Sequence, residues 1–105
     1  MTTLIAPPRQ LESLFARLAA EWKAGTKYLS STTAICTHPA YQRIIGLGPQ
    51  VIPLVLAELE AATGHWFWAL SALTGENPVG ADDAGRVEAM RAAWLRWGRD
   101  NGWIA

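Results

Sequence analysis

Residues 28–75 hold only three charged side chains in 48 positions, and this scarcity of charge limits how the chain can fold. The three are Arg43, Glu58 and Glu60. A segment with so few charges must bury most of its apolar surface, but a chain of 105 residues has too much surface to hide it completely. The sequence therefore predicts either a core covered by the more charged ends of the chain, or an apolar surface shared with a partner.

Apolar residues recur at helical spacing, and no stretch alternates as an amphipathic strand would. After Pro8 an amphipathic helix is expected to run to Gly25, a residue that commonly ends helices. Its apolar stripe consists of Leu11, Leu14, Phe15, Leu18 and Trp22. The sequence predicts an all-α fold, a compact bundle of about five helices. We expect residues 1–105 to form a single domain, with residues 1–7 flexible.

The middle of the chain predicts two helices after a hydroxyl-rich connection at residues 26–37, which includes one helical turn near residues 34–36. A short helix opens at His38–Pro39, because Pro is suited to a first helical turn, and closes at residues 46–48. The next helix runs from Pro49 to about residue 62 and is apolar on nearly every side, which predicts a central position.

The C-terminal part predicts two more helices separated by a loop at residues 76–82. The first spans residues 65–73. The second begins near Asp82–Asp83, whose carboxylates suit a helix N-terminus, and ends at Gly98 or Gly102. The last three residues then either fold back or protrude.

Residues 46–56, GLGPQVIPLVL, followed by Leu59, resemble the second-helix signature of HEAT-like repeats, in which a Gly precedes a helix starting V-x-P-x-L. WALSALTG and the later W-x-x-W look like the closing segment of some bacterial HEAT-like proteins. Across residues 22–104, the order of HPAYQRIIGLG, HWFWALSALTGENPV and WLRWG also resembles a small, largely uncharacterised bacterial all-α protein family. The resemblance implies a HEAT-like helical pair in the middle and a protein-interaction module without catalytic residues.

Composition excludes several classes of protein. Nine basic and nine acidic residues cancel, which argues against strong binding to nucleic acid or an anionic membrane. The longest aliphatic run, residues 51–57, is too short for a membrane span, which needs about 20 residues. Cys36 is alone and has no disulfide partner within the chain, and residues 1–8 lack the pattern of a secretory signal. We expect a soluble cytoplasmic protein.

Candidate catalytic and metal-binding groups lack the required pattern. Ser30, Ser31 and His38 supply a hydroxyl and an imidazole, but no nearby carboxylate completes a triad. These groups are expected to cap helices or turns instead. Cys36, His38 and His65 do not have the paired spacing of zinc ligands. We therefore expect no enzyme activity, no metal site and no cofactor.

The aromatic residues of the middle segment are candidates for a protein interface, because Trp and Tyr dominate interface hot spots. Trp66, Phe67 and Trp68 are consecutive, so on a helix they point about 100° apart and cannot all face one core stripe. The predicted interface residues are Tyr41, Trp66, Phe67, Trp68 and Trp103, with Arg96 and Arg99 as charges at the rim.

The predicted function is a non-catalytic, cytoplasmic protein-interaction module: a small partner, antitoxin-like protein or accessory subunit of a larger bacterial protein. Its partner would be another protein or a second copy of the chain. The alternative is an accessory nucleic-acid-binding protein that uses Arg91, Arg96, Arg99 and Trp97 of the last helix. Acidic residues keep that helix near neutral, which disfavours the alternative. A small enzyme is the third possibility.

Overall fold

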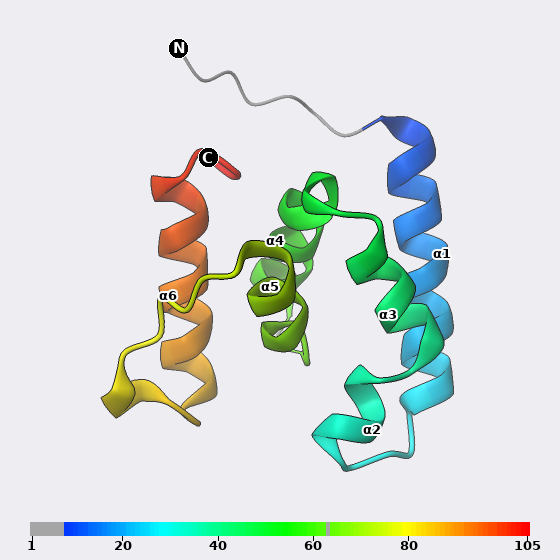
Figure 1. Ribbon diagram of the computed structural model, residues 1–105, viewed down its shortest axis with the longest axis horizontal. Helices are drawn as coiled ribbons and strands as arrows, with labels where there is room; N and C mark the ends of the chain where they lie inside the picture. Colours follow the sequence, from blue (N-terminus) through cyan, green and yellow to red (C-terminus); the bar gives the residue numbers. More distant parts are fainter. Residues whose placement is uncertain (1–7, 63) are drawn as a thin grey trace.

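The computed structural model describes residues 8–62 and 64–105, and within these ranges it contains helices and no strand (Figure 1). This confirms the predicted all-α bundle. The α-helices are α1 (Arg9–Thr26), α2 (Thr32–Cys36), α3 (Pro39–Gly46), α4 (Ile52–Ala61), α5 (Phe67–Thr74) and α6 (Val87–Asp100), and short 3₁₀ helices form at η1 (Pro49–Val51) and η2 (Ala81–Asp83). The expected flexibility of residues 1–7 lies outside the described residues.

The helices are arranged with α1 and α3 at one end, α6 at the other, and α4 and α5 between them (Figure 1). Helix α1 packs on α3, α4 packs on α6, and α5 contacts both α3 and α4. Buried residues from all six helices form one continuous hydrophobic cluster.

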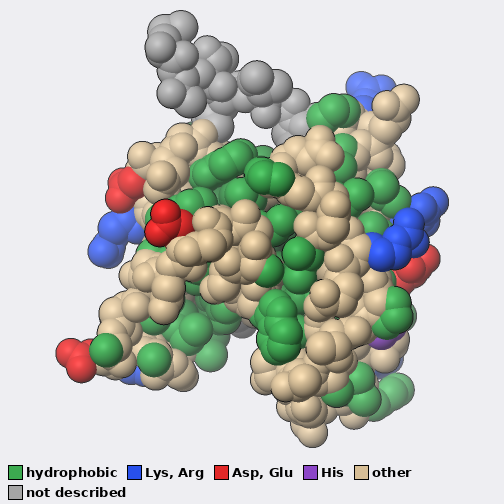
Figure 2. Space-filling view, in the orientation of Figure 1, with side chains coloured by type: hydrophobic (Ala, Val, Ile, Leu, Met, Phe, Trp, Pro, Cys, Tyr) green, Lys and Arg blue, Asp and Glu red, His purple; other side chains and the backbone are tan. Residues whose placement is uncertain are grey.

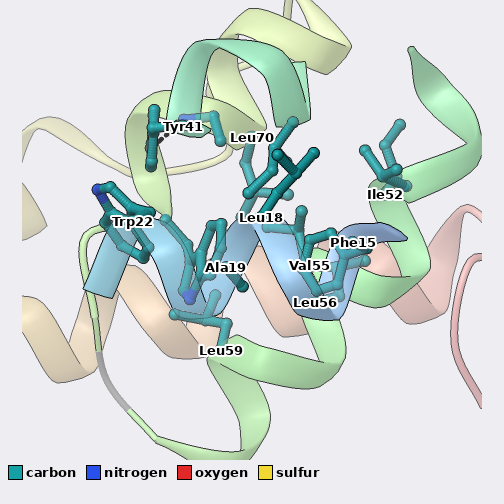
Figure 3. Packing of buried hydrophobic residues seen from close by; sticks show 14 of the residues in the cluster. Phe15, Leu18, Ala19, Trp22, Tyr41, Ile52, Val55, Leu56, Leu59 and Leu70 are labelled. Atoms are coloured by element: carbon teal, nitrogen blue, oxygen red, sulfur yellow. Dashed lines mark hydrogen bonds between the residues drawn. The ribbon is translucent and has the colours of Figure 1, made fainter. Parts of the chain in front are cut away.

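The core uses the apolar stripe predicted for α1 and most of the apolar surface of α4 (Figure 3). Phe15, Leu18 and Trp22 of α1 are buried, and so are Val55 and Leu59 of α4. Each fully buried aliphatic side chain contributes about 1.5–3 kcal/mol of transfer free energy to folding. Helix α4 therefore stabilises the fold from its centre, as its sequence predicted.

Helices α3 and α4 meet at a sharp corner. Pro39–Gly46 and Pro49–Ala61 are bent by 104° relative to each other. This angle differs from the antiparallel hairpin of a HEAT-like repeat. Because of this bend the two helices pack on different neighbours: α3 contacts α1, and α4 contacts α6.

Two predicted helix ends are corrected. Helix α1 continues past Gly25 to Thr26, and the imidazole of His38 occupies the space into which a Cβ at Gly25 would project. Asp82 and Asp83 do not cap α6, because they lie in η2 and α6 begins only at Val87.

The C-terminus folds back onto α6, one of the two predicted outcomes. Helix α6 passes through Gly98 and ends at Asp100, and the backbone N–H of Trp103 donates a 2.8 Å hydrogen bond to the carbonyl of Gly98. Gly98 is buried against Leu56 and Ile104, so the tail covers the junction between α4 and α6.

Candidate protein-interaction surface

Tyr41 and Trp66, two of the predicted interface residues, are core residues with exposed fractions of 0% and 2%. The Trp66 ring packs on Trp22 with centroids 4.7 Å apart and stacks on Tyr41 at 5.9 Å. The Tyr41 hydroxyl donates to the His65 carbonyl at 2.7 Å and accepts from the Ala69 N–H at 2.8 Å. The prediction that these two rings face a partner is therefore corrected: they hold α5 against α3.

Phe67 and Trp68, which follow Trp66 in the sequence, lie on the outer side of α5 and remain accessible. Phe67 is half-buried, whereas Trp68 is 40% exposed. This is the divergence expected for successive helical positions about 100° apart. We call the surface formed by Phe67 and Trp68 the α5 face.

The side of the molecule that α5 crosses has few charges. In Figure 2 hydrophobic and uncharged side chains cover the middle of this side, and Lys, Arg, Asp and Glu lie toward its margins. Residues 28–75 contain only three charged side chains, and the structure places part of this charge-poor segment at the surface. A partner could cover such a region without desolvating ionic groups, which is costly.

The arginines of α6 mostly serve the α4–α6 contact. Arg91 donates from Nε to the Leu59 carbonyl at 2.8 Å and from Nη2 to the Glu60 carbonyl, so it neutralises the C-terminal end of α4. Arg99 lies 3.5 Å from the carboxylate of Glu60. Among the described residues, Arg96 is exposed and forms no ion pair.

The two C-terminal tryptophans outside the deep core are both half-buried. Trp97 packs edge-on against Trp94 with centroids 5.4 Å apart, and Trp103 packs against the core cluster. Both rings are therefore only partly accessible to a nucleic-acid base that would stack on them. Of the residues chosen for the nucleic-acid alternative, the structure leaves only Arg96 both exposed and without an ion pair in the described ranges.

Sequence reasoning missed two exposed residues, Tyr28 and Leu29, in the connection between α1 and α2. Their exposed fractions are 89% and 45%, and the Lys27 ammonium lies 5.4 Å from the Tyr28 ring centroid. Their position in the sequence could have indicated this exposure. The two large apolar side chains lie just beyond the apolar stripe of the first helix and before a run of hydroxyl residues.

Leu29 also borders a groove of about 370 Å³ between the C-terminal ends of α1 and α4. Its lining includes the apolar residues Trp22, Leu29, Ile35, Ala61, Ala62 and Trp66. Lys23, Lys27, Glu58 and His65 supply the polar part. The Lys23 ammonium and Glu58 carboxylate are 2.6 Å apart and link α1 to α4 across the surface.

Two of the three candidate catalytic groups, Ser31 and His38, act as helix caps, as predicted. The Ser31 hydroxyl accepts from the Ala34 N–H at 3.3 Å, and His38 Nδ1 accepts from the Ala40 N–H at 3.1 Å. Cys36 is buried, and burial raises the pKa of its thiol, so the reactive thiolate is disfavoured. The described residues contain no cluster of three or more groups suited to a metal ion.

Comparison with known proteins finds no matching family model, curated protein or solved structure. No single described helix is long and apolar enough to cross a membrane. The α3–α4 corner reaches the required apolar length only when its two helices are counted together across the 104° bend.

Proposed function

We propose that the protein is a non-catalytic interaction module of the bacterial cytoplasm, a small partner or accessory subunit that binds a larger protein. The observation that carries the proposal is the 40% exposure of Trp68 within residues 28–75, a segment that holds only three charged side chains. Exposed tryptophans within apolar patches mark protein interfaces more often than other surface residues do.

The aromatic core of the fold is complete without the exposed part of the Trp68 ring. The core already contains stacked aromatic residues from α1, α3 and the start of α5, and the described residues leave no buried side-chain nitrogen or oxygen without a hydrogen bond. The exposed 40% of Trp68 is the part of its ring that contributes no burial within the monomer. When a partner covers this exposed apolar area, its removal from water contributes about 25 cal/mol of transfer free energy per Å².

The test compares Trp68→Ser with Val87→Ser, because Val87 is also exposed, at 48%, but lies at the start of α6. Each tagged protein is purified from its native cells at low and at moderate salt, and co-purifying molecules are quantified. We expect the unchanged protein and the Val87 variant to retain one stoichiometric protein partner, and the Trp68 variant to lose it.

Two results would refute the proposal. One is a monomer without any partner in all three preparations. The other is recovery of nucleic acid whose binding falls steeply with salt, which would favour the alternative based on α6.

A further inference from the structure

The half-buried side chain of His38 contacts the end of α1 and the start of α3 at the same time. Its Nδ1 atom accepts a 3.1 Å hydrogen bond from the Ala40 N–H and so caps α3. The other side of the ring lies over Gly25, in the last turn of α1, where a Cβ would overlap Nε2 and lie 3.1 Å from Cδ2. One imidazole therefore joins the two helices at the ends of the connection between them.

The cap requires one protonation state of the ring. An N–H donor needs a lone pair on Nδ1, so the bond forms only with the neutral imidazole that carries its proton on Nε2. Pro39, the first residue of α3, has no N–H, so the Ala40 amide is the first donor of this helix. Ala40 is only 3% exposed, which leaves water little access to replace the cap. Protonation turns Nδ1 into a donor that faces another donor, and the bond is lost.

The surroundings of the ring do not compensate for this loss. The titratable or charged side chains on the flanking elements are Glu21, Lys23 and Lys27 toward the end of α1, Cys36 in α2, and Tyr41 and Arg43 in α3. Among the residues that the structure describes, no carboxylate forms an ion pair with the imidazole. The C-terminus of α1 attracts a positive ring and the N-terminus of α3 repels it. Because the ring touches both ends, these two effects oppose each other and the lost hydrogen bond decides the balance.

We propose that His38 is a pH-sensitive latch between α1 and α3. Histidine ordinarily changes its charge between about pH 5 and 8. The neutral ring caps α3 and the protonated ring does not, so the first turn of α3 opens more often as the pH falls. The stabilisation by the latch is present near pH 8 and is lost toward pH 5. The latch needs neither a partner nor the α5 face, so it does not depend on the proposed interaction function.

Amide hydrogen exchange followed by NMR measures the opening directly. The protection of the Ala40 N–H, corrected for the intrinsic effect of pH on exchange, is compared at about pH 8 and pH 5, a range in which Asp and Glu remain largely ionised. We expect the protection in the unchanged protein to fall roughly fivefold over this range, the factor that corresponds to loss of a typical helix cap.

The two histidines of the chain offer a matched pair of variants. His38→Asn keeps a side-chain oxygen that can cap the helix but does not titrate, so its Ala40 protection should change by less than about twofold. His65→Asn makes the same substitution at an exposed ring, and His65 contacts Tyr41 and Cys36 through its backbone carbonyl. This variant should lose protection roughly fivefold, as the unchanged protein does. Circular dichroism melts establish that both variants are folded.

The state of the ring is measured in the unchanged protein by ¹⁵N NMR of the imidazole, so this test holds even where a variant fails to fold. We expect Nδ1 of His38 to be without a proton near pH 8. A proton on Nδ1 at that pH would overturn the latch. Equal Ala40 protection at both ends of the pH range would also overturn it, and so would the same loss of protection in His38→Asn as in the unchanged protein.

Discussion

Replacing Tyr41 with Phe removes a single oxygen atom from the centre of the aromatic core. That hydroxyl donates to the His65 carbonyl and accepts from the Ala69 N–H, and the residue is 0% exposed. In Tyr41→Phe the Ala69 N–H loses this partner in a buried position, and the His65 carbonyl keeps only the weak 3.9 Å contact from Cys36 Sγ. A buried polar group left without a partner costs about 1–3 kcal/mol, so we expect a loss of roughly 2–3 kcal/mol.

Urea unfolding followed by far-UV circular dichroism measures this loss as a lower midpoint with an unchanged m-value. Tyr28→Phe is the matched control, because its ring is 89% exposed, and its stability should change by less than about 0.5 kcal/mol. If Tyr41→Phe lowered the free energy of unfolding by no more than the control does, the hydroxyl would not hold α5 against α3.

The same residue predicts a dependence of stability on pH. Burial raises the pKa of Tyr41 above its ordinary value of 10.0, so the unfolded chain releases this proton before the folded one does. The stabilisation is complete below pH 10 and is lost as the pH rises above it. In Tyr41→Phe this contribution should vanish, and an equally steep alkaline decline in the variant would contradict the assignment.

Two further predictions test the α4–α6 contact. Gly98→Ala puts a Cβ 2.7 Å from Leu56 Cδ1 and should cost about 1–3 kcal/mol through overpacking, whereas Gly46→Ala meets no atom within 4 Å and should be neutral or stabilising in the same denaturation assay. Arg91→Ala frees two carbonyls at the end of α4 and should lower the free energy of unfolding by about 1–3 kcal/mol, with Arg96→Ala as a nearly neutral control. Equal losses within either pair would show that these contacts do not stabilise the fold.

Much of the fold could be predicted from local patterns. The stripe of α1, the apolar α4 and the caps at Ser31 and His38 all depend on residues within a few positions of one another. The end of α1 could not be predicted in this way. Gly25 looks like a terminator, but its role depends on the ring of His38, which lies thirteen positions further along the chain.

The candidate surface was harder to predict because exposure is decided by the tertiary packing. Consecutive aromatic residues must diverge, but only the docking of α5 against α3 determines that Trp66 points inward and Trp68 outward. Tyr41 resembled an interface residue because nothing near it in sequence shows that its hydroxyl has two backbone partners. Tyr28 was missed because periodicity describes helices and gives no account of the connections between them.

Site-specific photocrosslinking tests most directly whether the α5 face contacts a partner. A benzoylphenylalanine is placed at Trp68, which is 40% exposed, in one sample and at Val87, which is 48% exposed, in another, and each protein is irradiated in its native cells. We predict one discrete crosslinked protein from position 68, absent from position 87 and competed by the untagged parent protein. Crosslinks of the same pattern and intensity from both positions, or none from position 68, would contradict a partner-binding role for this face.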